Sequence, residues 1–310
     1  MRIVFLGSPD FAVPSLEALA AHYRVVGVVT QPDRPAGRGR RLRPPAVRLA
    51  AHRLGIPVVQ PPRLATPEAL GAIRSWTPDL IVVAAFGQLL RTSLLDLPRL
   101  GCLNVHASLL PRWRGASPVQ AAILAGDSTT GATLMRMDAG LDTGPLLAHR
   151  SIPVAPDDTG GSLAARLADL GAALLLETLP GYVSGSVQPA PQDDSRSTHA
   201  PLLRKTDGAL APTDSAILLA RKVRAYDPWP GTYFDCQGRR LAVIAAHAAP
   251  SSEPQPLGVA VLAGDRPAIT TTDGLLVLDR VQPVGKKPMP GEAFLRGNRD
   301  FLGSTISTPG

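Results

Sequence analysis

Short apolar runs alternate with helix-like stretches along the first half of the chain. The runs at residues 2–6, 25–30, 57–60, 80–85 and 101–106 are short and rich in Val, Ile and Leu, as buried strands are. Residues 14–21, 45–54 and 67–76 lie between them and show helical periodicity. Strands that alternate with helices indicate βαβ units. We therefore expect an α/β fold, with a doubly wound, mainly parallel sheet covered on both faces.

The pattern changes after residue 130. Residues 132–137 and 146–152 predict two strands joined by a polar turn, and residues 162–183 predict a long helix that closes the first domain, at 1–184. Residues 185–205 are rich in Pro, Gln, Asp and Ser in their first part and have little periodicity, so we place a linker there.

Residues 206–310 predict a smaller second domain. One helix is expected at 213–225, followed by short strand-like runs at 231–234, 240–246, 258–263 and 275–281 that Gly and Pro interrupt. This pattern is typical of a small β-barrel, and we expect an OB-like fold.

The net charge of +7 indicates an anionic partner, and the charge is concentrated in one segment. Residues 34–67 contain eight arginines and no acidic residue. Five of these arginines fall within 34–43, a stretch punctuated by glycine that we expect to be a flexible loop. Its position between a strand end and a helix favours phosphate binding over an ordinary solvated surface.

Other features narrow the class of protein. The first residues lack the long apolar core of a signal peptide, and the apolar stretch at 163–179 is too short and too charged to cross a bilayer. Two cysteines cannot build a disulfide framework, which suits a reducing compartment. Neither they nor the scattered histidines have metal-ligand spacing. We expect a cytoplasmic, monomeric protein without a metal or a membrane partner.

Three polar residues carry the candidate chemistry. Asn104 and His106 alternate along one predicted strand, so their side chains point to the same face, and Asp142 lies in the later polar turn. An amide N–H and a protonated imidazole can hold a developing oxyanion, while a carboxylate orients the imidazole and manages its proton. These groups suit acyl transfer to an amine.

Several strings resemble the 10-formyltetrahydrofolate-dependent formyltransferases. The central ones are NVHASLLPRWRGASP at 104–118 and MDAGLDTGP at 137–145, and RIVFLGSPDFAVPSLEAL, VVTQPDRPAGRGRRL and VGKKPMPGEAFLRG extend the likeness over nearly the whole length. The resemblance implies a Rossmann-like formyltransferase domain, with 10-formyltetrahydrofolate as the formyl donor and no metal. It also implies that Asn104, His106 and Asp142 are the catalytic residues.

The same resemblance assigns the remaining site residues. It implies contacts to the folate from Phe86, Gly87, Gln88, Leu89, Ser108, Leu109, Leu110, Pro111 and Asp138. In this family, the arginine-rich insertion enters the acceptor end of initiator tRNA, which points to Arg38, Arg40, Arg41 and Arg43. The expected acceptor is the α-amino group of the methionyl ester on that tRNA.

Three alternatives remain open at this stage. Two are related folate enzymes, a formyltransferase that acts on a nucleotide sugar and a hydrolase that releases formate. Neither substrate needs a long surface for a polyanion. The third is a non-catalytic RNA-binding protein, which explains the charge but leaves Asn104, His106 and Asp142 without a role.

Overall fold

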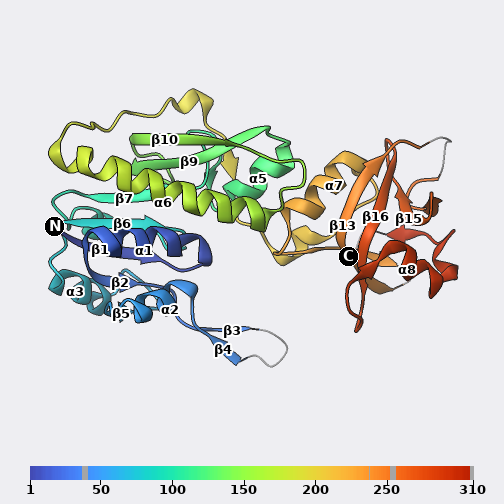
Figure 1. Cartoon of the computed structure of the whole chain (residues 1–310), viewed down its shortest axis with the longest axis horizontal. Helices are drawn as coiled ribbons and strands as arrows, with labels where there is room; N and C mark the ends of the chain where they lie inside the picture. The colour runs from blue at the N-terminus through green and yellow to red at the C-terminus, as the bar shows by residue number, and fades with distance from the viewer. Residues whose placement is uncertain (37–40, 237, 252–255, 308–310) are drawn as a thin grey trace. The chain divides into compact units, whose positions relative to one another are not determined.

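The computed structural model describes residues 1–36, 41–236, 238–251 and 256–307. Contacts divide the chain into two compact units (Figure 1). The first comprises Met1–Pro118, Thr129–Pro153 and Leu163–Pro201, and the second comprises Val119–Ser128, Val154–Ser162 and Leu202–Gly310. No helix within the described ranges is long and apolar enough to cross a membrane.

The first unit is built on a mixed sheet of seven strands in the order β10-β9-β7-β6-β1-β2-β5. The parallel part contains β7 (Cys102–His106), β6 (Leu80–Ala84), β1 (Arg2–Gly7), β2 (Arg24–Val29) and β5 (Val58–Val59). The strands β9 (Thr129–Arg136) and β10 (Leu146–Pro153) continue the sheet antiparallel. All seven strands were predicted, and the mainly parallel sheet is confirmed.

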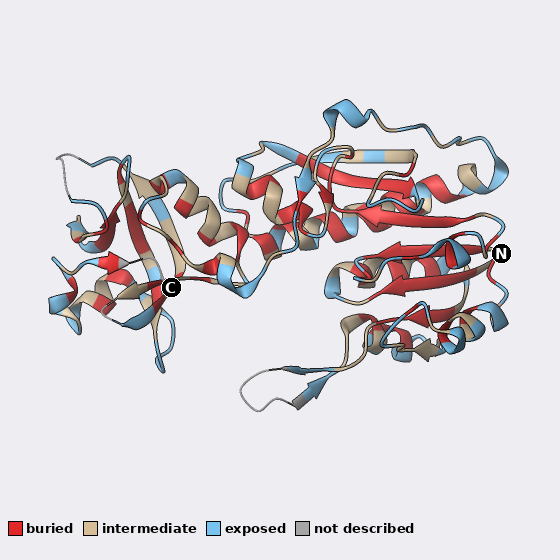
Figure 2. Cartoon of the chain, turned by 180° about the vertical axis from the view of Figure 1, so that it is seen from behind, coloured by how far each residue is buried: buried red, intermediate tan, exposed pale blue. Residues whose placement is uncertain are grey.

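Helices cover both faces of this sheet, as a doubly wound fold requires. Alternate strand residues such as Ile3 and Phe5 pack with α1 (Val13–His22), α2 (Ala46–Arg53) and α6 (Gly160–Ser184). The intervening residues, such as Val4 and Leu6, pack on the other face with α3 (Pro67–Ser75) and α4 (Thr92–Leu95). Because both faces are buried at the centre of the sheet, β1, β6 and β7 read as continuous apolar runs, and Figure 2 shows these central strands in red.

Residues 34–43 were expected to form a loop, and this prediction is wrong at both ends of the segment. The strands β3 (Arg34–Ala36) and β4 (Arg41–Arg43) pair antiparallel, with Arg34 opposite Arg43. Like charges directly opposite each other disfavour such a pair, so nothing in the sequence pattern predicts strands here.

The second unit contains a closed barrel. Its strands run in the order β14 (Ala260–Ala263), β15 (Arg266–Thr270), β16 (Leu275–Pro283), β13 (Arg239–Ala249), β12 (Thr232–Cys236) and β18 (Ile306–Ser307), with β17 (Met289–Pro290) beside β16. A bridge between Val259 and Thr305 joins the two ends of the sheet. The predicted barrel is therefore confirmed, although β15, β17 and β18 were not predicted individually.

Helices complete the second unit. The helix α7 (Ala216–Ala225) starts three residues after the start of the helix predicted at 213–225. Its N-cap is Ser215, whose hydroxyl accepts a hydrogen bond from the Leu218 N–H. Leu219 and Val223 from α7 pack with Phe234 and Leu278 in the barrel core. The helices α5 (Pro118–Ala125) and α8 (Gly291–Arg296) were not predicted.

The segment expected to be a linker makes specific contacts with the first unit. Ala190 forms a bridge with Leu146, and β11 (His199–Ala200) pairs parallel with β8 (Arg114–Gly115). The added Cβ of an alanine at position 115 would lie 2.5 Å from the Ala200 carbonyl oxygen, so glycine permits this approach. These backbone pairings need no apolar periodicity, which is why the segment reads as a linker in the sequence.

Candidate active site

The candidate residues lie at the carboxyl end of β7, where open α/β sheets usually bind ligands. Asn104 pairs with Met135 and His106 with Thr133 of β9, so the two polar side chains share one side of β7. Both are buried, at 8% and 6% exposure. Their apolar neighbour Val105 belongs to the core on the opposite face.

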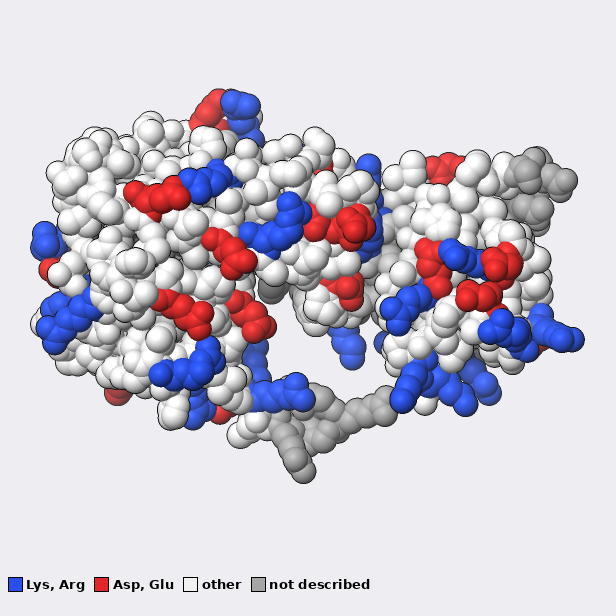
Figure 3. Space-filling model, in the orientation of Figure 1, with Lys and Arg blue, Asp and Glu red and all other residues white. Residues whose placement is uncertain are grey.

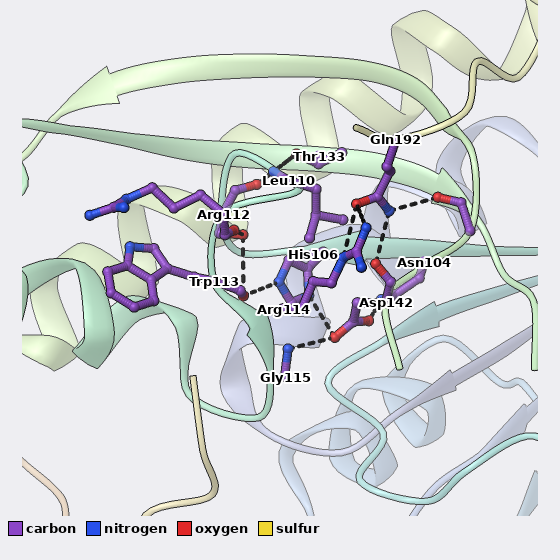
Figure 4. A network of polar contacts seen from close by, with 12 residues as sticks. Asn104, His106, Leu110, Arg112, Trp113, Arg114, Gly115, Thr133, Asp142 and Gln192 are labelled. Carbon is purple, nitrogen blue, oxygen red and sulfur yellow. Dashed lines mark hydrogen bonds and ion pairs between the residues drawn. The ribbon is translucent and has the colours of Figure 1, made fainter. Parts of the chain in front are cut away.

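The imidazole of His106 lies between two oxygen acceptors (Figure 4). Its Nε2 atom is 2.9 Å from the Trp113 carbonyl oxygen, and its Nδ1 atom is 3.7 Å from Oδ2 of Asp142. A carbonyl can only accept, so Nε2 carries the proton in this contact. Nδ1 is therefore the nitrogen that remains for a substrate and for the carboxylate.

Asp142 completes the cluster from the loop between β9 and β10. Its Oδ1 accepts from Asn104 Nδ2 at 3.3 Å, and its Oδ2 accepts from the Gly115 N–H at 2.9 Å. The Asp142 backbone has a φ of 54°, a left-handed conformation that is uncommon outside glycine. Such conformations often mark functional sites because surrounding contacts must hold them. The structure thus brings Asn104, His106 and Asp142 together.

Hydrogen bonds to Asp138 and a close backbone approach at Gly144 shape the loop that carries Asp142. Oδ1 of Asp138 accepts from the Gly140 N–H at 3.0 Å and from the Thr143 hydroxyl at 2.7 Å. An added Cβ at Gly144 would lie 1.9 Å from the Arg136 carbonyl oxygen, so a side chain there cannot be accommodated without movement. The exposed Asp138 therefore stabilises the turn within this compact loop through the hydrogen bonds that its carboxylate accepts.

Gln192, which the sequence did not single out, contacts this cluster and links it to Arg114. Gln192 donates from Nε2 to the carbonyl oxygens of Asp142 and Gly144, at 2.8 and 2.7 Å. Its Oε1 accepts from the buried guanidinium of Arg114. Gln192 falls in the segment expected to be a linker, where neither spacing nor periodicity marked it.

The turn at 108–111 is held by its own hydrogen bonds. The buried hydroxyl of Ser108 donates to the Arg112 carbonyl at 2.6 Å. The hydroxyl of Thr133 accepts from the Leu110 N–H and donates to the Ser108 carbonyl, at 3.2 and 2.6 Å. Ser108 and Leu110 are therefore buried inside the turn, whereas Leu109 and Pro111 are partly exposed.

The segment after β6 leaves the sheet at the same edge as the turn after β7, because the two strands are parallel neighbours. Phe86 is buried, and its carbonyl accepts from Gln31 Nε2 at 3.1 Å. The amide of Gln88 contacts the Leu64 N–H and the Pro61 carbonyl, so it supports the local backbone. The side chain of Leu89 is 77% exposed.

Two of the four predicted tRNA-binding arginines lie among the described residues, at the β3–β4 hairpin. Arg43 is exposed, Arg41 belongs to β4, and Arg38 and Arg40 lie outside the described residues. Lys and Arg side chains border this part of the first unit in Figure 3.

Asp33 holds the base of the hairpin. It contacts the guanidinium of Arg48 and accepts from Gln60 Nε2 at 2.8 Å. These hydrogen bonds keep the pKa of the Asp33 carboxyl below its usual value. The hairpin base is therefore fixed by a charged contact that does not use the exposed arginines.

Some basic residues of the second unit are engaged in contacts within the protein, and others are exposed to solvent. Lys222 pairs with Asp214 at 2.6 Å, and the Arg221 and Arg224 side chains donate to backbone carbonyls. Lys286 and Lys287 are exposed.

Across the part of the chain that the structure describes, no three His, Cys, Asp or Glu side chains gather as metal ligands would.

Comparisons with known proteins agree with this arrangement. A family model described as "Formyl transferase" matches residues 1–179, and one described as "Formyl transferase, C-terminal domain" matches residues 202–299. The methionyl-tRNA formyltransferase of Halorhodospira halophila is 50% identical over 98% of this chain and 99% of its own length. That of Chloroflexus aggregans is 47% identical over 96% and 97%.

A solved structure supports the fold independently. HypX from Aquifex aeolicus, in complex with tetrahydrofolic acid, superposes with a TM-score of 0.62 at 19% identity and covers 97% of this chain and 47% of that chain. At that identity the likeness concerns the fold alone. The two family models and the two relatives of nearly equal length show that the chain belongs to the formyl transferase family.

Proposed function

We propose that the chain transfers the formyl group of 10-formyltetrahydrofolate to the α-amino group of initiator methionyl-tRNA, giving N-formylmethionyl-tRNA for translation initiation. The convergence of Asn104, His106 and Asp142 at the end of β7 carries this proposal. The names of the relatives support the acceptor. We further propose that the protein acts as a monomer in the cytoplasm.

His106 and Asn104 stabilise the charge that develops on the formyl oxygen. The contact of Nε2 with the Trp113 carbonyl fixes the ring, so Nδ1–H of the protonated imidazole is the donor that faces the substrate. The Asn104 amide has two N–H groups, and one of them reaches Asp142. The second supplies another donor to the oxyanion. Donors of this kind contribute about 10²–10³ in turnover.

Asp142 orients the imidazole and manages the proton. The neutral amine attacks the formyl carbon, a new C–N bond forms, and the bond from that carbon to N10 of the folate breaks. The proton lost by the amine goes to the departing N10, through Asp142 and a bridging water. The Asp142 carboxyl group is suited to this step because hydrogen bonds from Asn104 and Gly115 hold it in place.

The residues at the ends of β6 and β7 fit a flat folate ring. Leu89, Leu109 and Pro111 present apolar surface, while hydrogen bonds within the chain fix the backbone that carries them. We assign Phe86, Gly87 and Leu110 to the backbone wall of the folate pocket. Ser108, Gln88 and Asp138 support its shape through the contacts they make inside the protein.

The hairpin favours a nucleic-acid acceptor over a small one. Arg38, Arg40, Arg41 and Arg43 fall within six consecutive positions of the sequence, and Arg43 is exposed. Guanidinium groups bind phosphates through paired hydrogen bonds. An amino sugar or a water molecule would need no such surface. We assign these arginines to the phosphates of the tRNA acceptor end.

The experiment is a formylation assay with three acceptors. The protein is incubated with 10-formyltetrahydrofolate and methionyl-tRNA, uncharged tRNA or free methionine, and formyl-methionine is measured after ester hydrolysis. We expect formyl-methionine only from the reaction that contains methionyl-tRNA. Formate release without an acceptor would instead favour a hydrolase, and formylation of a nucleotide-linked amino sugar in a fourth reaction would favour a sugar formyltransferase. Either result without formyl-methionyl-tRNA would overturn the proposal.

A further inference from the structure

Gln192 is the one side chain that joins the Asp142 loop to Arg114 among the contacts found in the described residues. Both the nitrogen and the oxygen of its side-chain amide form hydrogen bonds. The nitrogen donates twice to the loop, and the oxygen accepts twice from the guanidinium. The reverse orientation of the amide would place oxygen against two carbonyls and nitrogen against a cation. The surrounding groups therefore determine which way the amide points.

These contacts close a ring around the carboxylate. Gly115, which follows Arg114 in the chain, donates its N–H to Oδ2 of Asp142 at 2.9 Å. Gln192 then connects the Arg114 side chain back to the Asp142 carbonyl at 2.8 Å. Gly115 thus holds the side chain of Asp142, and Gln192 holds its main chain while accepting from Arg114, the residue before Gly115 in β8 (Figure 4).

The loop needs an external support of this kind. Asp142 has a left-handed backbone with a φ of 54°, a conformation that surrounding contacts must hold in a residue other than glycine. Its neighbour Leu141 is 53% exposed, and residues 138–140 are exposed as well, so apolar packing does little to hold the loop. The two hydrogen bonds from Gln192 fall on either side of Thr143 and fix the strained turn.

We propose that Gln192 is a positioning residue for formyl transfer, acting by fixing the Asp142 loop so that the carboxylate faces Nδ1 of His106. The inference rests on the proposed function for its effect on turnover. Gln192 acts through the main chain of Asp142, and Arg114 acts as the buried anchor that orients the Gln192 amide. A misplacement of reacting groups by about 1 Å can lower turnover about 100-fold.

The test uses two substitutions that separate the two ends of the amide. Gln192→Glu retains acceptors for Arg114 but removes the donor to the loop and sets an oxygen against two carbonyls. Gln192→Met retains the length of the side chain and removes both functions. We expect kcat to fall about 10- to 100-fold in both variants, with KM for each substrate within about twofold of the wild type.

Gln188→Glu is the matched control. This exposed glutamine lies in the same segment and donates to the carbonyl of Gly185, away from the Asp142 loop. We expect it to retain the kcat and both KM values of the wild type. Thermal unfolding of all variants then separates a loss of positioning from a loss of the folded chain.

A double-mutant cycle tests whether Gln192 acts through Asp142. In an Asp142→Asn background, Gln192→Glu should lower single-turnover rates by no more than about twofold further, because coupled residues give non-additive effects. A full additional loss would overturn the inference, since Gln192 would then act elsewhere. Wild-type kcat in the Gln192→Glu and Gln192→Met variants would overturn it as well.

Hydrogen exchange provides a readout that does not depend on activity. Amide exchange in the peptide covering residues 138–144 should be faster in Gln192→Glu than in the wild type or in Gln188→Glu. Unchanged exchange would overturn the inference even if formylation is observed. If the wild type shows no formylation in the three-acceptor assay, the proposed function fails separately, and the exchange data still decide whether Gln192 holds the loop.

Discussion

The Nδ1 atom of His106 faces Oδ2 of Asp142 across 3.7 Å. This separation is too long for a hydrogen bond and short enough for an ion pair when the imidazole is protonated. Both side chains are largely buried, at 6% and 12% exposure, so solvent screens the charge less than it would on a surface. The Asp142 carboxylate is therefore placed to orient the imidazole ring of His106.

Removal of either partner should strongly lower turnover. We expect His106→Ala and Asp142→Asn each to reduce kcat about 10²- to 10⁴-fold in the formylation assay, because each removes an acid–base or oxyanion group. His149→Ala is the control, since this exposed histidine lies on β10. Turnover within tenfold of the wild type in either active-site variant would exclude the assigned role.

Asn104, His106 and Asp142 could be predicted from the sequence because local patterns of apolar and polar residues mark them. Alternation along β7 places Asn104 and His106 on one side, and the apolar runs predict the parallel sheet whose strand ends collect such groups. The position of Asp142 followed from its polar turn between two strands. The sequence predicted the residues but not the distance between them, which depends on how the β9–β10 loop is held.

Gln192 and Arg114 could not be predicted as partners in the same way. Their contact joins residues 78 positions apart, and it arises from β11 pairing with β8 through main-chain groups that leave no apolar pattern. The β3–β4 hairpin escaped prediction for a related reason. Its pairing brings Arg34 opposite Arg43, against the usual preference for cross-strand charges.

The hairpin arginines should contribute to tRNA binding through phosphates. Replacing Arg43 with Ala should raise the Kd for methionyl-tRNA about threefold to tenfold and reduce the slope of log Kd against log salt by about 0.7–0.9. Arg53→Ala is the control, because this exposed arginine pairs with Glu17 at 2.9 Å. Filter binding at several salt concentrations measures both quantities. Equal slopes for wild type and Arg43→Ala would count against a phosphate contact.

The base of the hairpin should matter for affinity more than for chemistry. Asp33→Asn weakens the contact with Arg48 while retaining the size of the side chain. We expect KM for methionyl-tRNA to rise about threefold, with kcat and KM for the formyl donor unchanged, because a weaker contact at its base holds the hairpin less firmly. A fall in kcat at saturating tRNA would show that Asp33 supports the reaction itself.

Cys102 should resist thiol reagents in the folded protein. Burial raises the pKa of its thiol to about 12, and the side chain is 1% exposed beside the Leu94 and Leu95 carbonyls. Since the thiolate is the reactive form, labelling of a Cys236→Ser variant at pH 8 should be negligible until denaturant unfolds it. Rapid stoichiometric labelling of the native variant would contradict the burial of Cys102.

Asp79 should make the stability of the first unit depend on pH. Its carboxylate accepts from the Arg2 N–H at 2.7 Å and from Arg99 Nε at 3.0 Å, and these contacts hold its pKa below the usual 3.8. A lowered pKa in the folded chain gives stability that is complete above about pH 4 and is lost as the pH falls through the folded value. We therefore expect Asp79→Asn to lower Tm by about 2 °C at pH 7, with the difference shrinking below pH 4. Asp169→Asn, on an exposed position of α6, supplies the control in the same thermal scans. If the difference for Asp79→Asn stayed constant down to pH 2.5, its stabilising effect would not come from the ionised carboxylate.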